Sequence, residues 1–369
     1  MEGDFRSIMH LSYRDYRTIP EELRGTGRDQ IDEIYLKENL IHTLPDWFFV
    51  EMCHLRFLYL AGNMIETLPN QIGRLECLET LDLSDNSLHR LPNSIGRLKR
   101  LTKLMLNGNH IHQLPSEIGH LQRLEELHVR KNRLTNIPVQ LSQCVSLEEL
   151  QMDDNPGLVS IPTRVCNLPV LTYVSAERCN LFQLPFTINT TTLCFVLLFN
   201  SNQSLTHCPL ALERFAQPDY DAMEDKMKRI KNPSCYRQIH CKVVPYLLNF
   251  PSELGKLRNR HSSGTVPHSL FETALRASSR YRLLRWDHTE RYGLPQCLMN
   301  RLISGAVGCC SSVPCGKEIF SEAVLALVKR KEYARNFVLS VLFCSHLCAD
   351  RWFQYNCDAY EELDWDIPN

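Results

Sequence analysis

A block of the form LxxLxLxxNxLxxLPxxIxxL recurs along the first 210 residues, and this period constrains the fold more than any other feature of the chain. Successive blocks are 23 residues apart, except that two of them take 24 residues. The blocks begin at Ile31, Leu55, Leu78, Leu101, Leu124, Leu147, Leu171 and Cys194. One repeat of this length cannot bury its own apolar face. The period therefore predicts a solenoid in which neighbouring repeats share a continuous core.

Each block assigns a role to its residues. In the third block, Leu81 and Leu83 should point inward from a short strand, and Asn86 should bond the open backbone of the turn that follows. Pro92 suits the return segment because proline has no N–H to leave unpaired. Asparagines at one position, with Cys179 as the replacement, predict a stacked ladder of Asn39, Asn63, Asn86, Asn109, Asn132 and Asn155. This is the pattern of leucine-rich repeats, and it predicts an α/β solenoid with parallel strands on its concave face.

Charge balance, cysteine content and motif content narrow the class of protein. The 369 residues carry 41 basic and 42 acidic side chains, so the net charge gives no support to nucleic-acid binding. No apolar stretch approaches the roughly 18–20 residues that span a bilayer, and the N-terminus lacks the pattern of a secretory signal. No GxSxG, Walker, HExxH or kinase signature occurs. We therefore expect a cytoplasmic, non-catalytic protein with 16 reduced cysteines and neither nucleic acid nor membrane as a partner.

Function should lie on the side chains that the repeat does not dictate. Outward strand positions near the start of the solenoid carry Tyr35, Phe57 and Tyr59, and the polar middle carries His128. Aromatic clusters rimmed by charge are typical of protein-binding surfaces, so we expect a client protein to bind there. The apolar side chains at the far end suit either a partner or a covering domain; they are Tyr173, Phe195, Val196 and Leu198.

The period ends near residue 210 and divides the chain. We expect an N-terminal cap with an incomplete first repeat at 1–30, repeats at 31–210, a linker at 211–265 and a C-terminal domain at 266–369. The linker carries charged clusters and a short helix near 222–230. The last region is predicted to be a small helical, Cys-rich domain with helical stretches at 269–284, 294–305 and 320–334.

Two pairs of cysteines in the C-terminal domain predict a structural metal site. Four residues separate Cys310 from Cys315, and three separate Cys344 from Cys348. Thiolates are soft ligands, so in a reducing compartment this pattern predicts one zinc ion that cross-links the small domain. Alternative ligands are Cys309, His346 and Cys357. Buried, reduced cysteines in an apolar mini-domain are the alternative to a metal site.

The order of these features resembles a known family. The repeats, a linker, the run Cys-x4-Cys-Gly-x-x-Ile-Phe and a late Cys-x3-Cys resemble the family of leucine-rich-repeat-containing proteins 58 and 28. The resemblance covers most of the chain and is most specific at 294–348. It implies that the helices after the linker dock onto a ubiquitin ligase.

Two stretches carry that implication. Ser269-Leu270-x-x-x-Ala274 looks like a BC box, the helix that docks on elongin C. Ala274 stands where Cys is commoner, and Ser278 stands where an apolar residue is preferred. A downstream pattern looks like a cullin-2 box, with Leu294, Pro295, Leu298 and Leu302. Two core helices of a C-terminal cap would carry the same apolar residues.

The resemblance therefore implies a substrate receptor of a cullin-2/elongin-BC ubiquitin ligase, which recognises a client on its repeats and promotes its degradation. The implied partners are elongin B/C, cullin-2 and a client protein, for which the family suggests cysteine dioxygenase. The alternative is an intracellular leucine-rich-repeat signalling scaffold with no ligase link.

Overall fold

The computed structural model divides the chain into two compact units. The first unit comprises Met1–Val159, Leu168–Cys179 and Asn189–Ser201. The second unit comprises Ser160–Asn167, Asn180–Ile188 and Asn202–Asn369. The structure describes residues 7–24, 31–187, 196–199, 201–202, 204–205, 207–215, 236–241, 247–251, 254, 256–261, 269–280, 297, 302, 306–313, 315–331 and 338–367.

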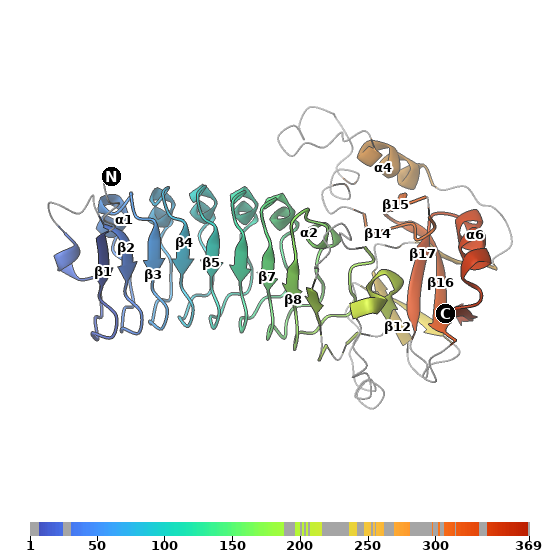
Figure 1. Cartoon of the computed structure of the whole chain (residues 1–369), viewed down its shortest axis with the longest axis horizontal. Helices are drawn as coiled ribbons and strands as arrows, with labels where there is room; N and C mark the ends of the chain where they lie inside the picture. Colours follow the sequence, from blue (N-terminus) through green and yellow to red (C-terminus); the bar gives the residue numbers. More distant parts are fainter. Residues whose placement is uncertain are drawn as a thin grey trace, which may run out of the picture. The chain divides into compact units, whose positions relative to one another are not determined.

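The first unit contains a parallel sheet with nine strands in its described part, and each strand pairs with the next one along the chain (Figure 1). The register places Tyr35 beside Tyr59 and Leu58 beside Leu81, so equivalent positions of successive repeats line up. The strands are β1 Ser7–His10, β2 Ile31–Tyr35, β3 Phe57–Tyr59, β4 Thr80–Asp82, β5 Lys103–Met105, β6 Glu126–His128, β7 Glu149–Gln151, β8 Tyr173–Ser175 and β9 Val196–Leu198. The predicted leucine-rich-repeat solenoid is confirmed.

Short helices carry the chain back between the strands of the first unit. Each begins after a proline, such as Pro69 or Pro92, whose fixed φ suits the start of a helix. Ile72 and Ile95 point from these helices into the core and are fully buried. The helices are η1 Glu21–Leu23, α1 Asp46–Glu51, η2 Asn70–Arg74, η3 Asn93–Arg97, η4 Ser116–His120 and η5 Val139–Gln143.

The predicted asparagine ladder is confirmed. The Asn109 amide donates to the Leu83 carbonyl oxygen at 2.9 Å, and its Oδ1 accepts from the Leu88 N–H at 2.9 Å. At the replaced position, the Cys179 thiol donates to the Met152 carbonyl oxygen at 3.3 Å. The side chains at this position therefore bond the backbone of neighbouring repeats, which joins consecutive turns through the buried leucine core.

The second unit contains a mixed five-stranded sheet in the order β10-β17-β16-β13, with β18 also paired to β16, together with a three-stranded and a two-stranded sheet. Its strands are β10 Cys208–Pro209, β11 Tyr236–Cys241, β12 Leu247–Pro251, β13 Lys256–Asn259, β14 Gly308–Cys309, β15 Glu318–Ile319, β16 Glu322–Arg330, β17 Leu339–Phe343, β18 Tyr360–Leu363 and β19 Trp365–Asp366. Its helices are α2 Thr163–Cys166, η6 Leu210–Phe215, α4 Leu270–Arg280 and α6 His346–Asn356 (Figure 1).

The predicted helix at 320–334 is wrong. Residues Glu322–Arg330 form β16, which lies between β17 and β13 in the five-stranded sheet. Every residue from Glu322 to Val328 is buried, so the continuous apolar run reflects burial on both faces of a sheet and not one face of a helix. The C-terminal domain, expected to be helical, therefore combines helices with a central mixed sheet.

Part of the segment predicted to be a linker also belongs to sheets. Strands β11, β12 and β13 all lie within 211–265, and β13 pairs in parallel with β16, which places Leu257 beside Ala323. Partners this far apart in sequence leave no local periodicity to detect. The helix predicted near 222–230 lies outside the described residues, whereas the one predicted at 269–284 is present as α4. In the part of the chain that the structure describes, no helix is both long and apolar enough to span a bilayer.

Candidate protein-binding surfaces and metal site

The aromatic residues predicted on the first strands form a stacked ladder. The rings of Tyr35 and Tyr59 lie 4.6 Å apart at an angle of 8°, and His10 stacks on the other face of Tyr35 at 4.9 Å. The Lys37 ammonium lies 4.8 Å from the centre of the Tyr59 ring. We call His10, Tyr35 and Tyr59 the aromatic ladder. We call the surface formed by the outward side chains of β1–β9 the strand face. Phe57 lies on it in the row next to the aromatic ladder, with the Arg56 guanidinium 5.3 Å from its ring.

Sequence reasoning missed two members of this surface, His10 and Lys37. His10 joins the aromatic ladder because β1 pairs with β2 and places it opposite Tyr35. The incomplete first repeat predicted at 1–30 did not assign His10 to a strand. Hydrogen bonding to Glu33 raises the pKa of Tyr35 to about 12, and burial raises the pKa of Tyr59. Both phenols are protonated at neutral pH, and the hydrogen bond to Glu33 already engages the Tyr35 hydroxyl.

His128 lies in the middle of the strand face between two carboxylates. Its Nε2 atom is 3.5 Å from Glu149 Oε1 and 3.9 Å from Glu126 Oε2. Glu126 also accepts from the Lys103 ammonium at 2.6 Å. Glu126, His128 and Glu149 each offer a ligand atom, and these atoms lie within 4.8 Å of one another. This region therefore differs in chemistry from the aromatic ladder. It presents a polar, ionic surface in place of stacked rings.

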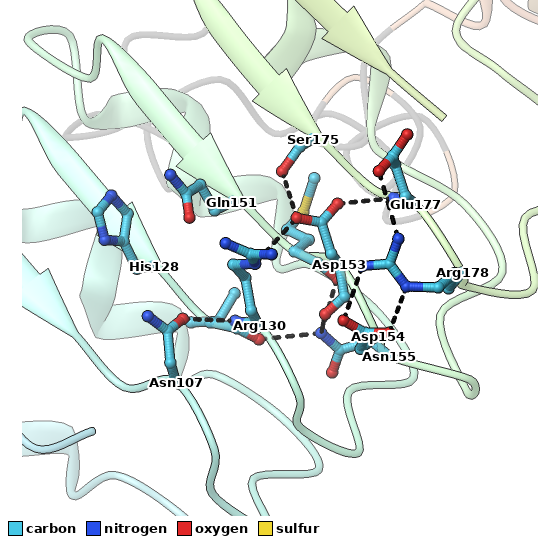
Figure 2. Close-up of polar contacts among 12 residues, drawn as sticks. Asn107, His128, Arg130, Gln151, Asp153, Asp154, Asn155, Ser175, Glu177 and Arg178 are labelled. Atoms are coloured by element: carbon cyan, nitrogen blue, oxygen red, sulfur yellow. Dashed lines mark hydrogen bonds and ion pairs between the residues drawn. The ribbon is translucent and has the colours of Figure 1, made fainter. Parts of the chain in front are cut away.

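Beyond His128, the charges of the strand face pair with one another (Figure 2). The Arg130 guanidinium lies 3.0 Å from Asp153, and the same carboxylate accepts from the Ser175 hydroxyl at 2.8 Å. Arg178 binds Asp154 with two nitrogens, at 2.6 and 2.9 Å. Because these groups satisfy one another, they offer less to a partner than the aromatic ladder does. Of the apolar far end, Val196 is exposed, and Phe195 lies outside the described residues.

The four predicted thiol ligands come together in the second unit. Cys310 and Cys315 lie in the turn between β14 and β15, Cys344 follows β17, and Cys348 lies in the first turn of α6. We call them the four-thiol cluster. The Cys344 sulfur is 3.5 Å from that of Cys315 and 3.6 Å from that of Cys348, and all four sulfurs lie within 4.8 Å of one another.

This arrangement fits a tetrahedral metal ion. Bonds of about 2.3 Å from zinc to sulfur require sulfur atoms about 3.8 Å apart, close to the separations in the four-thiol cluster. Hydrogen bonding to Cys310, burial and the charge on that neighbour raise the pKa of Cys344 to about 12. Without a cation the Cys344 thiol therefore stays protonated, and a metal ion would displace its proton on binding. The cluster could hold a metal ion.

The alternative ligands Cys309, His346 and Cys357 do not belong to the four-thiol cluster. The nitrogen Nδ1 of His346 is 3.0 Å from the Arg260 carbonyl oxygen, and Cys357 is exposed at the end of α6. Burial raises the pKa of Cys309, which lies in β14 beside the cluster residue Cys310. The pairs chosen from spacing are therefore the ones that the fold brings together.

Helix α4 has an inner and an outer side. Leu275 and Glu272 are fully buried, and Leu275 packs with Phe320 and Leu302. Leu270 is 89% exposed, and Ala274, one turn later, is half-buried. The leucine of the BC-box pattern thus lies on the surface.

The cullin-box pattern is placed differently. Leu302 is only 1% exposed and belongs to the core, with its carbonyl oxygen accepting from the Arg164 guanidinium at 2.7 Å. Leu294, Pro295 and Leu298 lie outside the described residues. Leu302 therefore has a structural role that its place in the pattern did not reveal.

Comparison with known proteins identifies the class of the repeats. Residues 42–153 match the family model described as "Leucine-rich repeat region". Together with the nine-stranded sheet, this match shows a leucine-rich-repeat region in the first unit, and such repeats support a protein-binding role.

Two solved structures are similar to parts of the chain. A leucine-rich-repeat protein of Leptospira interrogans is 26% identical, with a TM-score of 0.35, over 51% of this chain and 59% of that chain. The plant peptide hormone receptor RGFR1, in complex with RGF2, is 24% identical, with a TM-score of 0.43, over 49% of this chain and 32% of that one. The matches thus span about three fifths and one third of those two chains.

Proposed function

We propose that the protein is a cytoplasmic substrate receptor of a cullin-2/elongin-BC ubiquitin ligase. The first unit binds a client on its strand face, α4 docks on elongin C, and the client is ubiquitylated by the assembled ligase. The receptor itself forms and breaks no bonds; it raises the effective concentration of the ubiquitin-charged enzyme near a client lysine. The resemblance to the family of leucine-rich-repeat-containing proteins 58 and 28 suggests cysteine dioxygenase as the client.

The observation that carries the docking proposal is the exposure of Leu270. A leucine on a helix that serves only as core would be buried, as Leu275 is on the inner side of α4. Leu270 is instead 89% exposed, next to the partly exposed Phe271 and one turn before Ala274. A large side chain followed one turn later by a small one suits docking into an apolar groove of another helical protein, because the small residue allows close approach.

The N-terminus of α4 is fixed in a way that supports this role. The Ser269 hydroxyl accepts from the Glu272 N–H at 3.2 Å, and the Ser269 N–H donates to the Glu322 carboxylate at 3.2 Å. These bonds cap the helix immediately before Leu270. An anchor held on a capped helix loses less conformational entropy on binding than one on a free chain end.

The contact with cullin-2 belongs to Leu294, Pro295 and Leu298 in this proposal. The fourth residue of that pattern, Leu302, supports the second unit from within, since it packs against Leu275 and Phe320. We also propose that the ion held by the four-thiol cluster is zinc, because an all-sulfur, four-coordinate site is typical of structural zinc. The client-binding residues are Tyr35, Phe57, Tyr59 and His128.

The experiment compares two exposed leucines. Leu270→Asp should reduce binding of purified elongin B/C at least about 100-fold, because it would place an unpaired charge in an apolar pocket. Leu347 on α6 is 69% exposed, so Leu347→Asp is a matched control that should bind elongin B/C like the wild type. Both variants should unfold at the wild-type temperature, since neither side chain is buried.

Three results would oppose the proposal. Wild-type protein that does not bind elongin B/C would end the ligase proposal and leave the signalling scaffold, which needs only the strand face. Equal loss of binding in both leucine variants would point to a nonspecific charge effect. A lower unfolding temperature for Leu270→Asp alone would show that Leu270 is part of the core.

A further inference from the structure

We propose that metal binding by the four-thiol cluster holds α4 in the position from which it docks, so that the helix is presented only by the metal-loaded protein. The dependence of α4 on the metal is a property of the second unit alone. Its consequence for elongin binding rests on the proposed function.

The four-thiol cluster connects three elements of the second unit. The turn that carries Cys310 and Cys315 is joined by the cluster to the end of β17 and to the first turn of α6. Around this turn, the Cys310 N–H donates to the Lys317 carbonyl oxygen at 2.8 Å, and the Ser311 N–H donates to the Leu342 carbonyl oxygen at 2.9 Å. A metal ion would therefore tie a short hairpin to two other elements of the same unit.

At the tip of the hairpin, the Cys315 N–H donates to the Ser312 carbonyl oxygen at 2.8 Å, and Ser312 is buried. Val313 in the turn is 86% exposed, and Gly316 adopts a positive φ of 56°. The two flanking strands, β14 and β15, have only two residues each. A hairpin this short is marginal in water, so its conformation depends on what fixes the turn. Two members of the four-thiol cluster, Cys310 and Cys315, lie in this turn.

The residues that follow the hairpin form the seat of α4, that is, the surface on which this helix packs. The buried Glu272 carboxylate accepts from the Phe320 N–H at 3.1 Å and from the Ser321 N–H at 2.7 Å. It also accepts from the Ser321 hydroxyl at 2.8 Å and pairs with Arg276 at 2.8 Å. Phe320 and Ser321 come directly after β15. The inner side of α4 is thus bonded to the end of the hairpin that the thiols hold.

The apolar contacts of α4 lie at the same place. Leu275 packs against Phe320, and Leu302 completes this small core. Each of the three side chains is nearly or fully buried, yet the core they form is small. A helix of 11 residues has little stability of its own in water. Its order must therefore come from this seat and from the buried carboxylate.

Part of the seat does not depend on the hairpin, because the Ser321 carbonyl oxygen accepts from the Lys256 N–H of β13 at 3.1 Å. Glu322 is the first residue of β16, and it accepts from the Ser269 N–H and lies 3.4 Å from the Lys256 ammonium. Because β16 lies inside the five-stranded sheet, this contact should survive metal loss. We therefore expect metal loss to loosen α4 and not to unfold the whole second unit.

The experiment measures hydrogen exchange of the full chain in three states: zinc-loaded, stripped by a chelator with reductant present, and carrying Cys315→Ser. Zinc content is measured on each sample. Amides of 270–280 should exchange at least tenfold faster in both zinc-free states, while those of β3–β8 change less than twofold and those of β16 stay better protected than those of 270–280. Affinity for purified elongin B/C should fall at least tenfold in parallel. Cys357→Ser, at an exposed cysteine outside the cluster, is the matched control and should change nothing.

A second variant tests the path from the cluster to the helix. Glu272→Gln has one oxygen where the native contacts use two, so it should speed exchange of α4 at least tenfold while zinc content stays at the wild-type value. Unchanged exchange of α4 in zinc-free protein, or in Glu272→Gln, would overturn the inference. So would a chain that binds no zinc, or zinc loss that exposes β16 together with α4. If the wild type binds no elongin B/C but α4 still loosens on zinc loss, the proposed function fails and this inference stands.

Discussion

The two units of this protein differ in how far apart in the sequence their paired strands lie. In the first unit, each strand pairs with the strand one repeat earlier, so every contact of the sheet is local in sequence. In the second unit, β10 pairs with β17, which joins Cys208 to Leu339, and β11 pairs with β19, which joins His240 to Asp366. Pairing across such loops costs more chain entropy before any contact is gained. The first unit can therefore be stabilised repeat by repeat, whereas the second must form as one piece.

This difference explains where polar groups are buried. The first unit repeats one main device, the asparagine ladder, and adds single buried polar groups on its strands, such as Asp82 and Ser175. The second unit uses single, specific cross-links: the Glu272 carboxylate on the seat of α4, Glu322 beside Arg258, and the four-thiol cluster. Losing one rung of the ladder should weaken one neighbourhood, whereas losing a cross-link should affect distant segments at once.

The sharpest test of the comparison removes the metal. Structural zinc contributes about 10–16 kcal/mol in small peptides, so we expect chelation or Cys344→Ser to cost the second unit at least about 4 kcal/mol and lower its Tm by roughly 10 °C. The unfolding transition of the first unit should not move. Differential scanning calorimetry with elemental analysis of the same samples measures both effects.

A matched cysteine in the first unit serves as the control. Cys144 is buried like Cys344, but its thiol donates only to the Ile118 carbonyl oxygen at 3.2 Å. Cys144→Ser should therefore lower only the first transition, by about 1–2 kcal/mol, and leave zinc content unchanged. If Cys344→Ser did no more than this, the four thiols would be ordinary buried cysteines.

The next largest effect should come from the asparagine ladder. Asn109→Ala removes a side chain that donates to three carbonyl oxygens and accepts from the Leu88 N–H, and it leaves that buried N–H without its partner. Each of the three carbonyl oxygens keeps one other donor. We expect a loss of about 2–4 kcal/mol, confined to the first unit and measured by urea unfolding. Asn109→Cys copies the natural choice at Cys179, keeps a weak donor, and should cost less. Equal losses would show that the hydrogen bonds of the ladder contribute little.

The same contrast explains which features could be predicted from the sequence. The inward role of Leu81 and the bonding of Asn109 followed from the period, because the repeat fixes both neighbours of every residue. Strand β16 was misread as a helix because a run buried on both faces carries no alternation, and its partners β13 and β17 come from distant segments. The thiols could be found because cysteine pairs are rare and specific. Glu272 could not, since nothing in the sequence shows that its carboxylate would be buried against Ser321.

Outward positions of the first unit should matter for binding and not for folding. Replacing Tyr35, Phe57 and Tyr59 together by alanine should weaken client binding by about 1–3 kcal/mol per residue, because stacked aromatic side chains are typical anchors. Stability should fall by about 1 kcal/mol or less per residue, since the rings are half-buried and contact mainly each other. Purified cysteine dioxygenase is the probe, with binding measured by calorimetry and stability by urea unfolding.

The control for this variant is an apolar side chain away from the strand face. Val145 is exposed after helix η5, so Val145→Ala should change neither binding nor stability. If the triple variant binds the probe like the wild type while His128→Ala does not, the client contacts the ionic region around Glu126 and Glu149 and not the aromatic ladder.

The smallest effect concerns the ion pair of Arg178 and Asp154 in the first unit. Hydrogen bonding to Arg178 lowers the pKa of Asp154 below its ordinary value, despite an opposing contribution from burial. A carboxyl group with a lowered pKa in the folded state stabilises the protein above its unfolded pKa of about 3.9 and loses that contribution as the pH falls through the folded pKa. Since the pair is partly exposed, Asp154→Asn should cost only about 0.5–1 kcal/mol at pH 7.

The difference between Asp154→Asn and wild type should shrink in acid below about pH 3.9 and also in high salt, which screens the pair. Urea unfolding at pH 7 and at pH 3 measures it, and an unchanged difference at both values would refute the ionic explanation. Asp85 provides the matched control because it has the same left-handed backbone, with φ of 51° against 58° at Asp154. Among the described residues it has no ion pair, so Asp85→Asn reports only the backbone preference of asparagine. Subtracting its effect isolates the contribution of Arg178.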